Sequence, residues 1–139
     1  MGYSHYWSHP DIDPTAWAAF TADVKRIILM ATHAGIALAG PMGTGDPEVS
    51  DARISLNGSE ERGGDFETFE VTTDGTEYDF CKTGLRPYDQ VVCAILLAAY
   101  TRIDGVAIWS DGDINGDDWA EGRLLYAMAL DRTAPRVIG

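Results

Sequence analysis

Hydrophobic residues recur with helical spacing near the start of the chain. Between Trp17 and Ala31 they fall at intervals of three, four and seven residues, which places them on one face of an α-helix. Asp13 followed by Pro14 provides an N-cap acceptor and a residue suited to the first helical turn. We therefore expect a helix that begins at Pro14, ends at Gly35 and packs one face on a sheet.

The stretch from Val91 to Tyr100 is apolar on almost every side. Pro87 suits the first turn of a helix, and Asp89 is an acid placed where the helix dipole favours one. A helix with so little polar surface is expected in the centre of the core. It is too short to cross a membrane, because a span needs about 20 apolar residues.

Alternating polar and apolar residues predict strands in the middle of the chain. Residues 53–57 and 66–71 have the period of half-exposed strands. Asp74-Gly75 is a hairpin-turn dipeptide. The strand before this turn and the strand at 78–81 are therefore expected to pair antiparallel.

Two apolar runs and a last helix complete the expected fold. Residues 36–39 and 106–109 are interpreted as buried strands, and the segment before Asp13 as extended or looped. The last helix covers residues 119–130, and its inward face is expected to hold Leu124, Leu125 and Met128. The expected fold is α+β, a single compact domain over residues 1–139, with a mainly antiparallel sheet of about five strands packed against three helices.

Composition limits the partners and the location. With 139 residues, 45% of them hydrophobic, the chain can bury a core without disulfides. Its 22 acidic residues outnumber its 10 basic ones, and a net charge of -12 would repel a phosphate backbone, so no nucleic-acid partner is expected. The opening residues lack the basic and apolar regions of a signal peptide. A cytoplasmic protein with reduced thiols and no membrane partner is therefore expected.

Two cations precede the buried helix. Lys82 ends a strand and Arg86 lies beside the start of the helix, whose free N–H groups also attract anions. These two residues could form an anion pocket, or they could pair with carboxylates such as Asp79 and Asp89 and only hold the loop. Cys81 is better explained as a packing residue than as a nucleophile, since no matching histidine is evident.

An acidic loop follows the last expected strand. Asp111, Asp113 and Asn115, with Asp117 behind them, resemble the first half of an EF-hand calcium loop. The bidentate glutamate of that loop is missing, because Gly122 stands at its position. The acids also precede a helix, where capping explains them without a metal. Bound Ca²⁺ or Mg²⁺ is thus an alternative, and no other cofactor is expected.

Several polar and aromatic segments resemble those of a family of small, uncharacterised bacteriophage and prophage proteins. They are Gly2-Tyr3-Ser4-His5-Tyr6-Trp7, Ala39-Gly40-Pro41, Asn57-Gly58, Phe80-Cys81-Lys82-Thr83 with Pro87-Tyr88-Asp89, and Ser110-Asp111-Gly112-Asp113 with Trp119 and Gly122-Arg123. The resemblance spans nearly the whole chain and implies a phage protein that acts in a bacterial host cell. Gly84-Leu85 departs from the family, which has a small and then a basic residue there, so the loop is less basic.

These segments lie in loops or at the ends of elements, where packing alone would not select them. We expect one concave site for a small anionic, nucleotide-like ligand, with Tyr6 or Trp7 stacked on its ring and cations on its charge. In a phage, such a protein would sequester a nucleotide signal of host immunity. The expected ligand-binding residues are His5, Tyr6, Trp7, Asn57, Lys82, Thr83, Arg86, Tyr88, Asp89, Ser110 and Asp111.

Two other functions stay open. A metal-assisted hydrolase or transferase acting on such a ligand would hold the metal with Asp111 and Asp113 and use His5 as acid or base. An acidic protein inhibitor would instead dock a basic host factor or mimic DNA. The sequence contains no complete catalytic signature, so no catalytic residue is assigned, and it leaves open whether a homo-oligomer completes the site.

Overall fold

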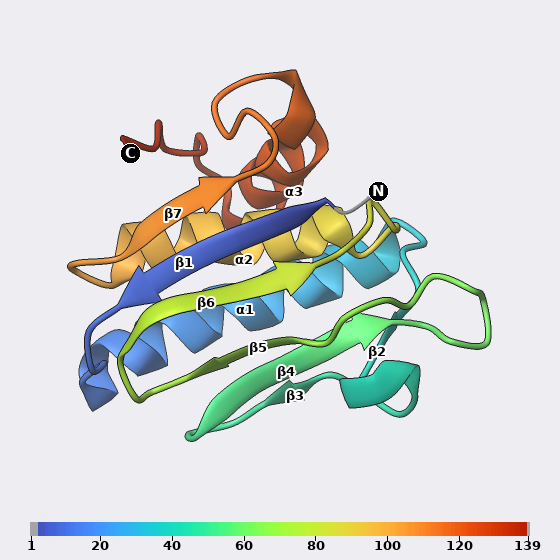
Figure 1. The fold of residues 1–139 in the computed structure, drawn as a ribbon, viewed down its shortest axis with the longest axis horizontal. Helices are drawn as coiled ribbons and strands as arrows, with labels where there is room; N and C mark the ends of the chain where they lie inside the picture. Colours follow the sequence, from blue (N-terminus) through green and yellow to red (C-terminus); the bar gives the residue numbers. More distant parts are fainter. Residues whose placement is uncertain (1–2, 139) are drawn as a thin grey trace.

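The computed structural model describes residues 3–138, and Gly2 of the opening motif lies outside that range. The described chain forms three α-helices and seven strands (Figure 1). The helices are α1 (Pro14–His33), α2 (Asp89–Arg102) and α3 (Ala120–Leu130). The strands are β1 (Ser4–His9), β2 (Leu38–Ala39), β3 (Glu48–Val49), β4 (Arg53–Gly58), β5 (Phe69–Thr72), β6 (Thr76–Lys82) and β7 (Ala107–Ser110). The expected α+β class is confirmed.

The strands are divided between two antiparallel sheets. One has three strands in the order β6-β1-β7, and the other has β4 paired with β2, β3 and β5. The opening segment, expected only to be extended or looped, is thus the central strand of the first sheet. Its Tyr6 pairs with Phe80 on one side and with Trp109 on the other.

The expected hairpin between β5 and β6 is wrong. β5 pairs with β4, whereas β6 pairs with β1. The connection between them is held against the chain after β1, where Gly75 N donates to Asp11 Oδ1 at 2.7 Å. A Cβ atom on Gly75 would lie 2.9 Å from the carbonyl carbon of Pro10, so only glycine fits this approach. The turn therefore carries the chain from one sheet to the other.

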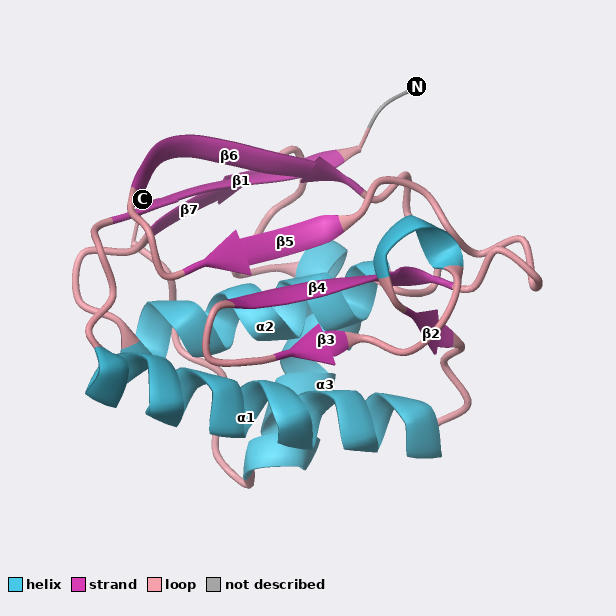
Figure 2. Ribbon diagram, turned by 90° about the horizontal axis from the view of Figure 1, so that it is seen from below, coloured by secondary structure: helices cyan, strands magenta, loops and turns pink. Residues whose placement is uncertain are grey.

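The helices cover one face of the sheets and leave the other face bare. The capping prediction for α1 is confirmed, since Asp13 Oδ1 accepts a hydrogen bond from Ala16 N at 2.9 Å. Helix α2 contacts both α1 and α3 and is buried on nearly all sides, as its apolar sequence predicts. In Figure 2, α1, α2 and α3 lie below β6, β1 and β7, and within residues 3–138 no helix lies above those three strands. None of the described helices is long and apolar enough to cross a membrane.

Helix α3 is turned differently from the prediction. Leu125 is buried, but Leu124 and Met128 are 60% and 54% exposed, so their expected inward orientation is wrong. The inward face contains Gly122 and Tyr126 instead. Gly122 lies so close to α2 that an added Cβ would overlap Cys93. Because α2 and α3 approach so closely here, α3 packs on α2 with the face that contains Gly122 and not with its more apolar face.

Candidate functional site

His5 lies at the centre of a buried polar cluster. Its side chain is completely buried, and both ring nitrogens have partners. His5 Nε2 lies 2.6 Å from Asp89 Oδ1, and His5 Nδ1 lies 2.7 Å from Ser110 Oγ. Thr83 donates a hydrogen bond to the same Asp89 oxygen, and Cys93 Sγ lies 3.5 Å from Nε2. We call these five residues the His5 cluster.

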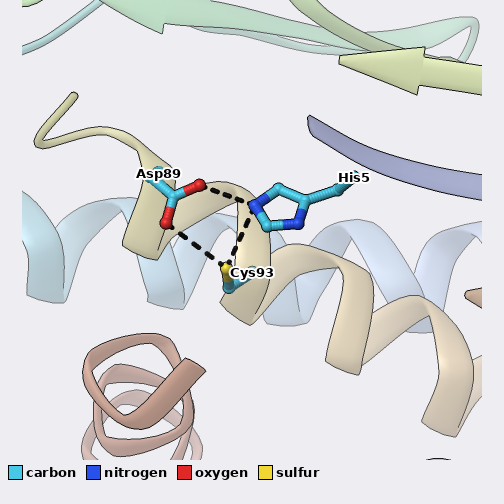
Figure 3. A group of neighbouring side chains, drawn as sticks. All are labelled: His5, Asp89 and Cys93. Carbon is cyan, nitrogen blue, oxygen red and sulfur yellow. Dashed lines mark hydrogen bonds and ion pairs between the residues drawn. The ribbon is translucent and has the colours of Figure 1, made fainter. Parts of the chain in front are cut away.

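The backbone explains why these residues meet. Side chains alternate along a strand, so His5 points from β1 towards the helices while Tyr6 points to the bare face. Ser110 is the direct partner of His5 on β7. Asp89 and Cys93 are one helical turn apart on α2, which puts both on the face beneath β1. Figure 3 shows the three side chains of His5, Asp89 and Cys93 pointing towards one another.

Hydrogen-bond donors around Ser110 assign the proton positions. Its Oγ accepts from Gly112 N at 3.0 Å and from Trp119 Nε1 at 3.1 Å, and both of these groups can only donate. The hydroxyl hydrogen is therefore left for His5 Nδ1. The imidazole then carries its own hydrogen on Nε2 and donates it to Asp89.

This is the proton order of a Ser–His–Asp triad, but Ser110 is not a free nucleophile. Both lone pairs of Ser110 Oγ are already occupied by N–H donors. His5 has no exposed surface from which to exchange a proton with a substrate. In this conformation the hydrogen bonds orient the imidazole, and they activate no attacking group.

Burial keeps the two thiols neutral. Burial, and then the Asp89 carboxylate, raises the pKa of Cys93 well above its ordinary value, and Sγ donates towards Asp89 Oδ2 at 3.7 Å. Burial raises the pKa of Cys81 from 9.0 to about 12. Cys81 is completely buried and contacts the Glu67 carbonyl oxygen, which agrees with a packing role.

Both thiols are expected to resist modification in the folded protein. Because the thiolate is the reactive form, reaction with Ellman's reagent at pH 8 should be at least about 100-fold slower than in the urea-unfolded chain. Stopped-flow absorbance of the released thionitrobenzoate measures both rates. A native thiol that reacts at the unfolded rate would show that the cluster opens to solvent.

A polar pocket of about 230 Å³ borders the His5 cluster. Asp89 and Cys93 form part of its wall, and α3 closes it at Gly122. Four carboxylates but only one guanidinium line the pocket, so it is electrostatically suited to a cation rather than an anion. These charged residues are Asp89, Asp117, Asp118, Glu121 and Arg86. A larger hollow of about 720 Å³ along α1 contains none of the expected site residues.

The bare face of the three-stranded sheet carries a row of aromatic rings. The Tyr6 ring is nearly parallel to that of Trp109, with centroids 6.5 Å apart at 15°, and to that of Tyr78, at 6.0 Å and 26°. Phe80 follows at 5.9 Å from Tyr78. Trp109, Phe80 and Tyr78 are 41%, 48% and 57% exposed. We call these four residues the aromatic row.

The expected ligand-binding residues fall on two faces of the sheet. His5, Thr83, Asp89 and Ser110 lie together in the His5 cluster, whereas Tyr6 belongs to the aromatic row on the opposite face.

Lys82 lies on the outer side with the aromatic row. It is two residues beyond Phe80 on β6, and Cys81 between them points into the core. Asp111 lies at the edge of the row, where its carboxylate accepts from Ser4 N at 2.9 Å and from the Tyr6 hydroxyl at 3.2 Å. Desolvation first, and then Asp111, raises the pKa of Tyr6.

Three expected residues have structural partners instead of open surface. Trp7 is 2% exposed and packs on Phe69. Asn57 is buried and uses its amide to hold the loop at Phe66. Tyr88 is buried and donates to the Glu67 carbonyl oxygen. Their expected contact with a ligand would require these groups to become exposed.

The two loop cations make no ion pair with any described residue within 4.0 Å. Arg86 is exposed and lies over the Phe66 ring, with its guanidinium carbon 5.4 Å from the ring centroid. The ion pairs with Asp79 or Asp89 that would let Lys82 and Arg86 only hold the loop are therefore not formed. Both charges remain available to a partner.

The acidic loop satisfies its own polar groups. Asp113 Oδ1 accepts from Asn115 N at 3.1 Å, and the Asn115 amide exchanges two hydrogen bonds with Val137. Asp117 begins a short 3-10 helix and is exposed. In residues 3–138, the group of three potential metal ligands brought together is His5, Asp89 and Cys93, and not the loop acids.

Sequence reasoning missed Cys93 and most of the aromatic row. Cys93 could have been found from its spacing. It lies four residues after Asp89 on the predicted helix, so the two side chains share a face. Trp109 sits one residue before Ser110 and therefore points to the opposite face of β7, which the alternation of a strand also predicts.

Comparison with known proteins gives no match to a protein-family model, a curated protein or a solved structure. The functional argument therefore rests on the geometry and chemistry of these side chains.

Proposed function

We propose that the protein binds a small anionic ligand with a planar ring, of the nucleotide class, on the aromatic row. The observation that carries this proposal is the set of four aromatic side chains laid across β6, β1 and β7 on a face that the helices leave bare. Large exposed rings gathered on one face are uncommon on a protein without a partner for them. A ligand ring parallel to these planes extends the series at Trp109, the end of the row opposite Phe80.

Lys82 supports an anionic ligand rather than a neutral one. It lies on the same side of β6 as Phe80, and its ammonium group makes no ion pair within 4.0 Å among the described residues. The nearby Glu67 carboxylate is instead held by the Lys82 backbone N–H at 2.8 Å. On a chain of net charge -12, an unpaired ammonium group beside stacked rings is a local attraction for phosphate. Asp111, which holds the Tyr6 hydroxyl and lies across Ser4 from Lys82, is a hydrogen-bond acceptor for ligand amines or hydroxyls.

Trp109 provides a direct signal for binding. The chain has four tryptophans, and Trp7, Trp17 and Trp119 are at most 4% exposed. A stacked nucleotide should therefore quench mainly Trp109. Calorimetry and fluorescence titration against mononucleotides, cyclic nucleotides and ADP-ribose derivatives should identify a ligand. Trp109→Ala should then weaken its affinity about 10- to 100-fold, since one base–aromatic stack contributes about 1–3 kcal/mol.

Control variants distinguish the loss of ring stacking from effects of removing any exposed side chain. Leu124→Ala removes a comparably exposed apolar side chain from α3 and should leave the affinity unchanged. Lys82→Gln should weaken binding and flatten its dependence on salt, because it removes only the charge. Absence of heat and of quenching with every nucleotide, or equal affinity in Trp109→Ala, would overturn the proposal.

Recovery of the ligand distinguishes sequestration from turnover. If the protein sequesters a signalling nucleotide of a bacterial host, the ligand released by denaturation after long incubation is chemically unchanged. Chromatography of that released ligand measures this. Conversion of the ligand would favour the hydrolase or transferase alternative.

A further inference from the structure

Three side chains of the His5 cluster have the arrangement of ligands around a metal ion. One atom from each of His5, Asp89 and Cys93 lies within 4.8 Å of the other two. Cys93 Sγ is 3.5 Å from His5 Nε2 and 3.7 Å from Asp89 Oδ2. Bond lengths of about 2.0–2.3 Å around a tetrahedral Zn²⁺ place neighbouring ligand atoms about 3.3–3.6 Å apart. Two separations are therefore already close to those of a zinc site.

The pocket beside α3 gives this group access and a favourable charge. Asp89 and Cys93 line the pocket, so an ion between them faces it. Asp117, Asp118 and Glu121 add three further carboxylates to the pocket wall. A cation entering the pocket is thus attracted before it meets its ligands.

We propose that His5 Nε2, Asp89 Oδ2 and Cys93 Sγ bind one divalent transition-metal ion of the Zn²⁺ class, with a fourth coordination position open to the pocket. Thiolate and imidazole ligands favour Zn²⁺ or Co²⁺ over Ca²⁺ or Mg²⁺, which prefer oxygen ligands alone. Three protein ligands and one open position are the arrangement of zinc sites that act on a bound water or substrate. Its three ligands lie outside the acidic loop, although Asp117 of that loop lines the pocket. The proposal does not rest on the aromatic row.

Metal binding requires two proton changes. The hydrogen on His5 Nε2 moves to Nδ1, so the imidazole stays neutral, and the Cys93 thiol loses its hydrogen. One proton is therefore released for each ion bound. A small rotation of the Asp89 carboxylate separates Oδ1 from Nε2, which the hydrogen bond now holds at 2.6 Å.

Groups around the histidine can accommodate this change. With its hydrogen on Nδ1, His5 donates to Ser110 Oγ, as metal-bound histidines commonly donate to a neighbouring oxygen. Ser110 then releases one of its two N–H partners and turns its own hydrogen elsewhere. The Tyr3 hydroxyl is buried, faces Ser110 and makes no hydrogen bond of good geometry among the described residues. That unpaired oxygen is a ready acceptor.

Cobalt titration tests the site without knowledge of any substrate. Reduced, EDTA-treated protein is titrated with Co²⁺ and monitored by absorbance. One equivalent should bind, with a thiolate-to-cobalt band in the near ultraviolet and the strong visible bands of tetrahedral cobalt, and Zn²⁺ should displace it. Cys93→Ala should abolish the thiolate band and weaken binding by at least about 100-fold. Cys81→Ala removes the other buried thiol and should retain both the band and the affinity.

Thermal unfolding provides an independent readout. Zn²⁺ in excess should raise the melting temperature of the wild-type protein and of Cys81→Ala, but not that of Cys93→Ala. Ser110→Ala, which removes the partner of Nδ1, should weaken Co²⁺ binding about 10- to 100-fold. The proposal is overturned if stoichiometric Co²⁺ gives no thiolate band. Binding that survives in Cys93→Ala and is lost in Asp113→Asn would also overturn it and assign the ion to the acidic loop.

Discussion

Replacement of Asp89 by alanine is expected to lower the free energy of unfolding by about 2–6 kcal/mol, because it leaves two buried donors unpaired at a cost of about 1–3 kcal/mol each. Asp89 accepts hydrogen bonds from His5 Nε2 and from Thr83 Oγ1, and both donors lie in residues with no exposed surface. Without the carboxylate these donors stay buried and unpaired. Urea unfolding followed by far-ultraviolet circular dichroism measures the loss.

The asparagine variant separates the hydrogen bonds from the negative charge. Asp89→Asn keeps an oxygen that can accept from His5 Nε2, so its expected loss is smaller, about 1–2 kcal/mol. An alanine variant within about 1 kcal/mol of wild type would mean that the His5 cluster contributes little to stability. Equal losses in the two variants would mean that the charge itself, and not the count of hydrogen bonds, carries the effect.

Gly122→Ala is expected to lower the free energy of unfolding by about 1–3 kcal/mol, the usual cost of overpacking a core. The added methyl group would overlap Cys93 Cβ and lie 3.1 Å from the Gln90 carbonyl oxygen. Helices α2 and α3 would have to separate at the border of the His5 cluster. Without this overlap, alanine in place of glycine would stabilise the helix. A decrease in the free energy of unfolding therefore indicates the steric contact with α2.

A second glycine serves as the control for this effect. At Gly64 an added Cβ makes only ordinary contacts, the nearest at 3.8 Å from Pro87, and Gly64→Ala should change stability by less than about 0.5 kcal/mol. Chemical denaturation of both variants gives the comparison. A Gly122→Ala protein as stable as wild type would show that α3 can move away from α2 at no cost.

Helix positions were readable because their signals are local. The N-cap at Asp13 and the spacing of Trp17, Phe20 and Val24 predict both the start of α1 and its buried face. The same spacing argument failed for α3, where Leu124 and Met128 are exposed. There the decisive contact is the approach of Gly122 to Cys93, and a pattern of apolar residues contains no information about backbone proximity.

Strand partners were less predictable than strands. Alternation located β4 and β5, and a strand was expected where β6 lies, but the turn dipeptide at Asp74-Gly75 did not decide which strands pair. β6 pairs with the edge of β1, and Gly75 contacts Pro10 and Asp11 just after β1. These contacts place β6 in the first sheet. Pairing of this kind depends on surfaces that form only when distant segments have folded together.

The sequence by itself determined the α+β class, the central buried helix and most of the polar residues that form the His5 cluster. The fold class and the buried helix follow from the periodicity of apolar residues. The polar residues stood out because they lie at the ends of apolar strands and helices, where packing alone would not select them. Only the tertiary structure decided that His5 meets Asp89 and Ser110, which are 84 and 105 positions away, and that Tyr6 beside it faces the opposite side. The alternation of β1 separates one expected concave site into a buried cluster and an exposed aromatic row, because neighbouring side chains of a strand cannot share a face.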